Sequence, residues 1–499
     1  RETRSRPPPP RGRAVAVMSP TTAGEAFERI AREETRDAAS MEEFAALAAA
    51  PGAIERVDVA TATTATRPGR GAALVDVRSP VEYERGRVPG AVNVPLFEND
   101  VRARVGLLYK TKGRGEAMVA GMDAVAPRLE DIVRAAAEAC ASTSAASGEG
   151  DGEACADVYV MCFRGGMRSS CVGWLLTQRL TGKRVRVVDG GYKGFRKWAL
   201  ERCGPVCGLP APRVCVVGGR TGVGKTRALL ALRAQGEQVI DLEGLANHAG
   251  SAFGWVGREP QPTSEHYSNL VACEWHELDP NRWVYIEDEG PHVGRCSVDP
   301  LLFERMRNAP LVLRMVASRD IRLRTLVKDY ATSELRSDPQ WLPTMRESVD
   351  KLAKRLGGDR VREIQSKLDA GDFAAVAAGL LEYYDGLYDK HLMSKRKDRR
   401  HAASDKSSPK TLTPTAIDRL VAETGSLSPL STPGSDDAGS VVSRGSASSV
   451  EDEARAGVVV DVHCHPDVDG ALDERALVRD ILCAVALFDA RPDHVDDDE

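Results

Sequence analysis

The chain has few aromatic residues, no long apolar run and no regular cysteine spacing. Only 5% of its 499 residues are aromatic, although 42% are hydrophobic. No apolar stretch approaches the roughly 18 residues of a membrane-spanning helix, so we expect no transmembrane segment. The 11 cysteines are odd in number and irregularly spaced, which argues against a secreted disulfide framework. These shortages favour a soluble, intracellular protein in a reducing compartment.

The chain also lacks a strong excess of charge of either sign. Its 68 Lys and Arg residues face 73 Asp and Glu residues, a formal net charge of -5. A uniformly basic nucleic-acid-binding coat is therefore excluded, and any polyanion site must be regional. Residues 301–330 hold seven Lys and Arg residues against three acids. This stretch predicts either a contact with RNA phosphates or an ordinary charged helix face.

Composition sets off two segments that contain too few apolar residues to form a core, and a third, at the C-terminus, that is apolar but too short for a core of its own. Residues 1–38 begin rich in Arg and Pro, which indicates either a transit-peptide remnant or an untranslated stretch read through. The first reading would direct the protein to an organelle, the second would leave it in the cytoplasm. Residues 394–456 are basic and then rich in Ser, Pro and Gly, so we expect a disordered linker. Residues 457–499 form a short C-terminal segment of unknown role.

Between these segments, the sequence predicts two α/β domains. Residues 39–204 and residues 210–393 each alternate short β-branched strand signals with helical stretches. Such alternation is typical of a parallel sheet flanked by helices. Inside the first domain, residues 141–156 are small, polar and Gly-rich, which predicts a surface insertion.

A cysteine follows an apolar strand in the first α/β domain and precedes a helical stretch. At such a turn, loop amides and the helix N-terminus stabilise a thiolate and hold an anion. The alternative is a buried structural cysteine before an ordinary glycine turn. The candidate nucleophile is Cys162, and the candidate anion-binding residues are Arg164, Gly165, Gly166 and Arg168.

The residues upstream of this loop resemble the rhodanese family. They include an Asp-x-Arg pair, Asp76 and Arg78, and a Gly-x-x-Pro-Gly-Ala turn that begins at Gly86. The resemblance implies that Cys162 carries a persulfide and that the loop holds the anionic donor. Five residues separate Cys162 from Arg168, a wider loop than in plain sulfurtransferases and closer to the phosphatase relatives. A Met precedes the cysteine where phosphatases have His, so phosphatase chemistry is the weaker alternative.

The second α/β domain opens with a phosphate-loop motif, G-x-x-x-x-G-K-T, between a strand and a helix. Backbone amides of this motif wrap a diphosphate, its Lys offsets the charge, and its Thr hydroxyl binds a divalent metal such as Mg²⁺. The motif does not tell whether the diphosphate belongs to a nucleotide. The predicted diphosphate-binding residues are Gly219, Gly222, Gly224, Lys225 and Thr226.

Two further strand signals of this domain end in acids. Carboxylates beside a phosphate loop are candidates for binding a metal or orienting a water molecule, although solvated strand ends are the alternative. No metal-ligand set is firmly predicted. His248, which follows the first of these strands, is either catalytic or structural. The candidate carboxylates are Asp241, Glu243, Glu287, Asp288 and Glu289.

The order of these blocks makes the chain similar to the tRNA 2-selenouridine synthase family. The likeness rests on the fused domains, the DLEGLANH block from Asp241, the strand ending in EDE, and Tyr383-Tyr384-Asp385. It implies an enzyme that converts 2-thiouridine at the wobble position of tRNA to 2-selenouridine through an S-geranyl intermediate. Geranyl diphosphate and selenophosphate would be the donors. Ala249 and residues 290–292 replace an expected Arg and an expected Ser-Arg stretch, which predicts an altered second substrate site.

The residues alone leave three classes of function open. The first is this tRNA-modifying transferase, with geranyl transfer at the phosphate loop and selenium transfer at Cys162. The second is a sulfurtransferase fused to a nucleotide-hydrolysing domain, and the third is a non-catalytic RNA- or nucleotide-binding module.

Near the C-terminus, His463 and His465 resemble the first metal pair of amidohydrolase-like enzymes, but too few residues follow to supply the other ligands.

Overall fold

The computed structural model describes residues 54–67, 69–146, 157–202, 212–394, 458–466 and 472–489. The chain forms two compact units, Arg1–Ala199 and Leu200–Glu499. The predicted N-terminal extension and nearly all of the predicted linker lie outside the described residues. Within the described part, no helix is long and apolar enough to cross a membrane.

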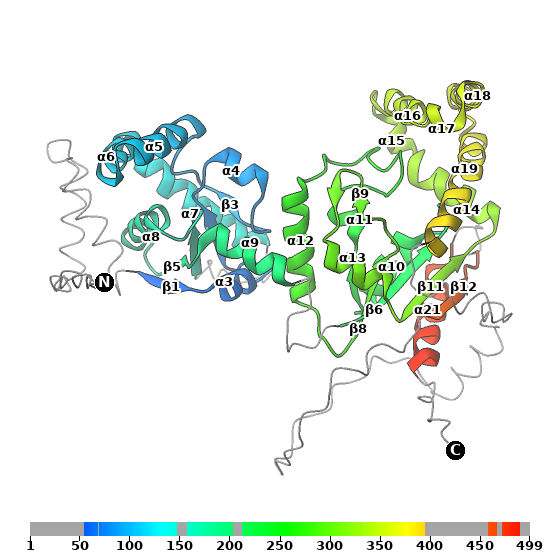
Figure 1. Ribbon diagram of the computed structural model, residues 1–499, viewed down its shortest axis with the longest axis horizontal. Coiled ribbons are helices and arrows are strands. Elements are labelled where there is room, and N and C mark those ends of the chain that lie inside the picture. Colours follow the sequence, from blue (N-terminus) through cyan, green and yellow to red (C-terminus); the bar gives the residue numbers. More distant parts are fainter. Residues whose placement is uncertain are drawn as a thin grey trace, which may run out of the picture. The chain divides into compact units, whose positions relative to one another are not determined.

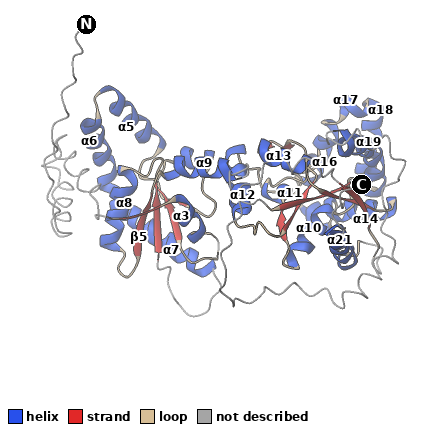
Figure 2. Cartoon of the chain, turned by 60° about the horizontal axis from the view of Figure 1, so that its bottom comes forward, coloured by secondary structure: helices blue, strands red, loops and turns tan. Residues whose placement is uncertain are grey.

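The first unit is built on a five-stranded parallel sheet with the order β1-β5-β4-β2-β3. Its core includes Val75, Val160 and Val187, all fully buried, and helices flank the sheet (Figure 2). The strands are β1 (Glu55–Val57), β2 (Ala73–Asp76), β3 (Val92–Asn93), β4 (Asp157–Met161) and β5 (Arg184–Val188). The helices are α3 (Val59–Ala65), α4 (Pro80–Arg85), α5 (Asn99–Thr111), α6 (Arg114–Val125), α7 (Leu129–Ala146), α8 (Met167–Arg179) and α9 (Gly191–Arg202), with a short η2 (Ala126–Arg128).

One boundary in this unit differs from the sequence prediction. Residues 141–146, expected to belong to a surface insertion that spans residues 141–156, are helical instead, because α7 continues to Ala146. Three of these six residues are Ala, the strongest helix former, and the Ser142 and Thr143 hydroxyls donate to the Ala139 carbonyl of the same helix. The remainder, residues 147–156, lies outside the described residues.

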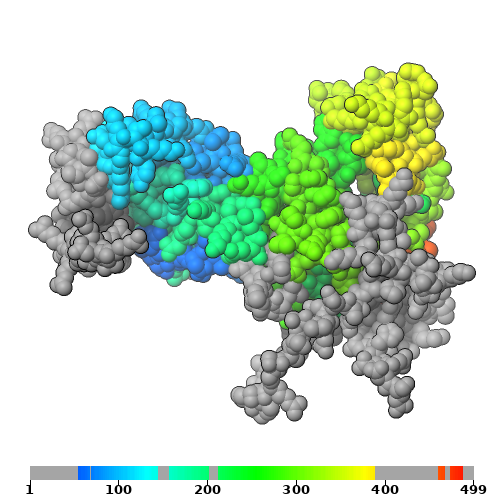
Figure 3. All heavy atoms as spheres, viewed as in Figure 1, coloured from blue at the N-terminus to red at the C-terminus, as the bar shows by residue number. Residues whose placement is uncertain are grey.

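Helices α5 and α6 form part of the exposed surface of this unit, in blue and cyan (Figure 3).

The second unit contains another five-stranded parallel sheet, with the order β12-β11-β6-β8-β7. Two parallel sheets with flanking helices confirm the predicted α/β class. The strands are β6 (Arg213–Gly219), β7 (Gln238–Ile240), β8 (Trp283–Glu287), β11 (Leu311–Val316) and β12 (Val458–His463), with an antiparallel pair β9 (His292–Val293) and β10 (Cys296–Ser297). The helices close to this sheet are α10 (Lys225–Ala234), α11 (Leu242–Leu245), α12 (Ser264–His276), α13 (Pro300–Arg307), α14 (Arg319–Tyr330) and α21 (Glu474–Asp489).

A helical group packs beside this sheet around its own apolar core. The core includes Phe253, Trp341, Val349 and Ile364. Through α19 the group contacts α14, which lies next to the phosphate loop. Its helices are α15 (Ser333–Ser337), α16 (Trp341–Asp350), α17 (Ala353–Leu356), α18 (Gly358–Asp369) and α19 (Phe373–Ser394).

The C-terminal segment, to which the sequence assigned no role, completes the second sheet. β12 pairs in parallel with the whole of β11 (Figure 1). Arg314 of β11 binds Asp461 of β12 through two ion-paired contacts of 2.6 Å. Leu477 and Ile481 of α21 are buried in the same core as the phosphate-loop strand. This segment is therefore an integral edge strand and covering helix of the second unit.

Candidate functional site

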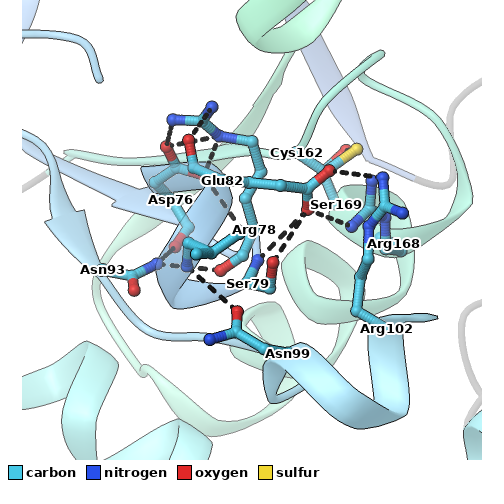
Figure 4. A network of polar contacts seen from close by, with 11 residues as sticks. Asp76, Arg78, Ser79, Glu82, Asn93, Asn99, Arg102, Cys162, Arg168 and Ser169 are labelled. Atoms are coloured by element: carbon cyan, nitrogen blue, oxygen red, sulfur yellow. Dashed lines mark hydrogen bonds and ion pairs between the residues drawn. The ribbon is translucent and has the colours of Figure 1, made fainter. Parts of the chain in front are cut away.

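Cys162 follows β4 directly and lies at the base of a tight loop that leads into α8. Its side chain is buried, and the Ser169 hydroxyl in the first turn of α8 has two acceptors for its single proton, the Cys162 sulfur at 3.2 Å and the Gly166 carbonyl at 3.0 Å (Figure 4). Hydroxyl donation stabilises a thiolate more than a thiol, because hydrogen bonds to charged acceptors are the stronger ones. Ser169 was not among the predicted site residues, although it stands next to Arg168 in the sequence.

Two glycines allow this loop to curl. Gly165 has a φ of +64°, and a Cβ there would lie 2.4 Å from the carbonyl oxygen of Val188. A Cβ at Gly191, the first residue of α9, would lie 2.2 Å from the carbonyl oxygen of Cys162. Because both contacts involve backbone, a larger residue at either position would displace the loop.

The carbonyl groups of this loop are held by the surrounding protein. The backbone amide of Tyr192 donates to the Cys162 carbonyl at 2.9 Å, and the amide of Lys193 donates to the Phe163 carbonyl at 2.9 Å. The Arg56 guanidinium donates to the Gly165 carbonyl. With their carbonyl oxygens engaged in this way, these residues turn fewer partial negative charges toward an incoming anion.

Arg168 and Arg102 share one carboxylate beside the cysteine. Arg168 Nη1 lies 3.4 Å from Glu82 Oε2, and Arg102 Nη2 lies 2.8 Å from Glu82 Oε1 (Figure 4). Burial opposes ionisation of Glu82, but the Arg102 hydrogen bond and the Arg168 charge outweigh it and hold its pKa below the ordinary value. Two cations and one carboxylate leave a net positive charge. Glu82 and Arg102 were not predicted as site residues.

The predicted Asp-x-Arg pair is a buried ion pair with a structural role. Asp76 and Arg78 are almost completely buried and form an ion pair of 2.6 Å. Arg78 also donates to the carbonyl of Glu82 at 2.9 Å, and its guanidinium lies 3.7 Å from the centre of the Tyr192 ring. The pair therefore fixes the end of β2 relative to α4, which carries Glu82.

Four of the five predicted residues of this loop line a single cavity of about 580 Å³. Gly165 does not line this cavity. The four are Cys162, Arg164, Gly166 and Arg168.

The phosphate loop connects β6 to α10 in the second unit. Gly222 and Gly224 have positive φ values of +81° and +89°, and Lys225 Nζ donates to the Gly219 carbonyl at 3.0 Å. Apart from Gly219, the predicted diphosphate-binding residues line a cavity of about 730 Å³. The loop thus has the backbone curvature that a diphosphate cradle needs.

Residues distant in sequence stabilise the backbone of the phosphate loop. Arg322 of α14 donates through Nε to the Thr221 carbonyl at 2.9 Å and forms an ion pair with Asp385 of α19. Asp385 therefore supports the loop through Arg322, which gives the Tyr-Tyr-Asp block a positioning role.

The C-terminal segment also touches the phosphate loop. A Cβ at Gly224 would lie 2.4 Å from Cδ2 of Leu472. Arg227 of α10 lies 4.0 Å from Glu474 at the start of α21. The segment thus contacts the loop directly.

Three of the five candidate carboxylates gather beside Thr226. Its hydroxyl donates to Glu243 Oε2 at 3.0 Å, and the Glu243 backbone amide donates to Glu287 Oε2 at 3.1 Å. Burial and the Glu243 carboxylate raise the pKa of Glu289 to about 8. Burial, followed by neighbouring charges, also raises the pKa of Glu243 and of Glu287. The cluster therefore retains protons near neutral pH.

Asp241 and Asp288 have structural partners instead. Asp241 caps α11 by accepting a hydrogen bond from the Gly244 amide at 2.7 Å, and Asp288 is ion-paired with buried Arg307. His248 is buried, and burial, with the charges of nearby arginines, lowers its pKa. A neutral imidazole is therefore expected there at pH 7.

Oxygen donors beside the phosphate loop suit Mg²⁺ only in part. Among the described residues, no three His, Cys, Asp or Glu side chains form a group that could hold a metal ion. Glu287 Oε1 is buried and has no hydrogen-bond partner within that part of the chain. Mg²⁺ usually binds proteins through one or two carboxylates together with substrate phosphates. Thr226 and Glu243 provide hard oxygen donors for that arrangement.

Several arginines of the basic stretch at residues 301–330 form ion pairs with carboxylates of the same unit. Its Arg307, Arg314 and Arg322 are bound to Asp288, Asp461 and Asp385, respectively. Arg319 lies 3.6 Å from Glu382. The stretch therefore does not present its full charge to RNA. Lys328, together with Arg258 and Arg355, lines the phosphate-loop cavity, as does Ala249.

Comparison with known proteins assigns both units to families. Residues 61–197 match the rhodanese-like domain, and residues 212–414 match the tRNA 2-selenouridine synthase AAA domain. A curated tRNA 2-selenouridine synthase of Marinobacter nauticus is 33% identical over 350 residues, which cover 65% of this chain and 89% of the relative. The protein of that name from a Sulfurovum species is 33% identical over 343 residues, 63% and 87% of the two chains. The chain therefore belongs to the tRNA 2-selenouridine synthase family.

Proposed function

We propose that this protein converts 2-thiouridine at the wobble position of tRNA to 2-selenouridine through an S-geranyl intermediate. Geranyl diphosphate and selenophosphate would be the co-substrates. The observation that carries the proposal is the presence, in one chain, of a cysteine loop with a cationic rim and a phosphate loop with neighbouring carboxylates. Family membership supports tRNA as the substrate.

Geranyl transfer is assigned to the phosphate loop. The sulfur of 2-thiouridine attacks the first carbon of the geranyl chain, the carbon–oxygen bond breaks, diphosphate leaves, and the N3 proton of the base passes to solvent. Loop amides and Lys225 stabilise the charge that develops on this leaving group. Mg²⁺, held by Thr226 and Glu243, would supply further charge neutralisation when bound.

Selenium transfer is assigned to the cysteine loop. The Cys162 thiolate attacks the phosphorus of selenophosphate, so that a sulfur–phosphorus bond forms, the phosphorus–selenium bond breaks and hydrogen selenide is released. Selenide then attacks C2 of the S-geranyl base, the carbon–sulfur bond breaks, and geranyl thiol leaves. Water finally hydrolyses the sulfur–phosphorus bond to free phosphate and regenerate Cys162.

Two features support this route. Selenium in selenophosphate already has the oxidation state of selenide, so no oxidant is needed, whereas a perselenide on Cys162 would require one. The loop from Cys162 to Arg168 has the length found in phosphatase relatives, and Ser169 donates to the sulfur that must act as nucleophile and leaving group.

The direct test is product analysis. The purified chain, 2-thiouridine tRNA, geranyl diphosphate and Mg²⁺ should give S-geranyl-2-thiouridine in the nuclease digest, and selenophosphate should convert it to 2-selenouridine. Absence of both nucleosides with intact tRNA would contradict the proposal. Nucleotide hydrolysis without either donor would instead favour a sulfurtransferase fused to a nucleotide-hydrolysing domain.

A further inference from the structure

The cavity that opens on Cys162 is largely apolar, which an anion site alone does not explain. It has a volume of about 580 Å³ and lies within the first unit between the cysteine loop and helices that include α5, α6 and α8. The apolar side chains in its wall include Val105, Met118, Met122, Val125, Leu129 and Leu175. A solvated anion such as phosphate gains nothing from these side chains.

Five cationic side chains also line this cavity. They are Arg102, Lys110, Arg114, Arg164 and Arg168. The first four of these side chains are exposed, which places them where solvent can reach them. A ligand that matches such a cavity has an apolar chain joined to a polyanion. Such a ligand buries the chain inside and keeps its phosphates against the cations.

We propose that this cavity binds the geranyl chain of S-geranyl-2-thiouridine while the phosphates of the same tRNA lie against the surrounding cations. The inference rests on the proposed function and assigns the prenyl group of the second step to the first unit. Selenium enters at C2 as the geranylthio group leaves, so the chain must lie close to the selenium source. Cys162 lines the cavity, which satisfies this requirement.

The size of the cavity agrees with this occupant. A volume of about 580 Å³ lies within the range of about 300–1,000 Å³ that is usual for small-molecule sites. Burial of a ten-carbon chain also supplies a driving force, because each apolar carbon removed from water adds to the binding free energy. The geranyl chain would hold the modified base at Cys162 until selenium arrives.

A glycine on α5 provides a way to fill the cavity. A Cβ built on Gly106 meets only Arg102 Nη1, at an ordinary contact distance of 3.7 Å. Gly106 lines the cavity, so Gly106→Phe should reduce its volume without a backbone clash, and it also raises helix propensity. Leu107 is the matched control, because it is 62% exposed and does not line the cavity. Met118→Trp on α6 is a second filling variant.

Binding is measured by calorimetry on the full chain with two nucleosides, S-geranyl-2-thiouridine and S-methyl-2-thiouridine. We expect the geranyl nucleoside to bind at least about 100-fold more tightly. Gly106→Phe and Met118→Trp should weaken that binding by about tenfold or more, and Leu107→Phe by less than about twofold. Equal affinities for the two nucleosides, or unchanged geranyl binding in both filling variants, would overturn the proposal.

Turnover separates this inference from the proposed function. With 2-thiouridine tRNA and both donors, the filling variants should accumulate the S-geranyl nucleoside and form less 2-selenouridine than Leu107→Phe does. If the unmodified protein makes neither product, the proposed function fails and the nucleoside binding still decides the role of the cavity. If the filling variants make 2-selenouridine at the rate of the unmodified protein, the cavity proposal fails and the proposed function stands.

Discussion

The Ser169 hydroxyl donates a hydrogen bond to the Cys162 sulfur over 3.2 Å, and both side chains are buried. The donor comes from the first turn of α8 and the acceptor from the end of β4, so the strand–loop–helix turn itself creates the contact. The contact places a hydroxyl donor against the sulfur that the proposed route uses as nucleophile.

Ser169→Ala should slow thiolate chemistry at Cys162. A hydrogen bond to a charged group contributes roughly 1.5–3 kcal/mol, so we expect iodoacetamide to alkylate Cys162 about tenfold more slowly at pH 7. The rate is read from the mass of the peptide that contains Cys162. Thr177→Ala on the same helix, whose hydroxyl donates to the Trp174 carbonyl, should keep the original rate. An equal rate in Ser169→Ala would assign Ser169 a purely structural role.

Selenophosphate alone should phosphorylate the cysteine. Rapid acid quenching of the chain mixed with selenophosphate, without tRNA, should trap one phosphoryl group on the peptide that contains Cys162, with release of selenide. Arg168→Ala should reduce trapping by about tenfold or more, because a charge-assisted contact to the phosphoryl oxygens is lost. Selenium bound to Cys162, in place of phosphate, would contradict the proposed route and favour a perselenide.

The carboxylate cluster should make stability depend on pH. The pKa of Glu289 is about 8 in the folded chain against an ordinary value of 4.5, so its proton is bound more tightly when the chain is folded. This contribution is complete below about pH 4.5 and is lost as pH rises towards 8. In metal-free buffer, the melting temperature should therefore fall across this range, and Glu289→Gln should reduce the fall.

The control for this measurement is Glu259→Gln, since Glu259 is exposed and should leave the pH dependence unchanged. Because the three carboxyl groups interact, the midpoint belongs to the cluster rather than to one residue. An identical pH profile for Glu289→Gln and the unmodified chain would contradict the assignment.

The C-terminal helix should be required for the stability of the second unit. Ile481 is fully buried in the core that contains the phosphate-loop strand. Ile481→Ala should destabilise this unit by about 2–5 kcal/mol in urea unfolding, and geranyl transfer should fail at a lower temperature. Arg475→Ala, at an exposed position on the same helix, should change stability by less than about 0.5 kcal/mol. Equal unfolding curves would show that α21 does not contribute to this core.

Local patterns predicted the elements that carry the motifs. The strand expected before the cysteine loop and the strand expected to end in EDE are observed as β4 and β8, because short β-branched runs between turn residues encode strands locally. The pairing of β12 with β11 was not predicted, since about 140 residues of chain separate the strands and no local pattern encodes register at that distance.

The candidate site shows the same difference between features that a local sequence pattern encodes and contacts that depend on long-range packing. Cys162 and Thr226 could be found from contiguous motifs. Glu82 and Asp385 act through arginines from other helices, and their contacts depend on how those helices pack. Ser169 was the exception, because its position at the start of a helix after a cysteine loop was a signal that could have been used.

The central claim is that the two loops serve successive steps on one tRNA base, and nucleoside analysis of two variants tests it most directly. With 2-thiouridine tRNA and both donors, Cys162→Ala should form S-geranyl-2-thiouridine at the rate of the unmodified chain and yield no 2-selenouridine. Lys225→Ala should form neither from 2-thiouridine tRNA but should convert tRNA that is already geranylated. The reverse pattern, with geranylation lost in Cys162→Ala and retained in Lys225→Ala, would contradict the account.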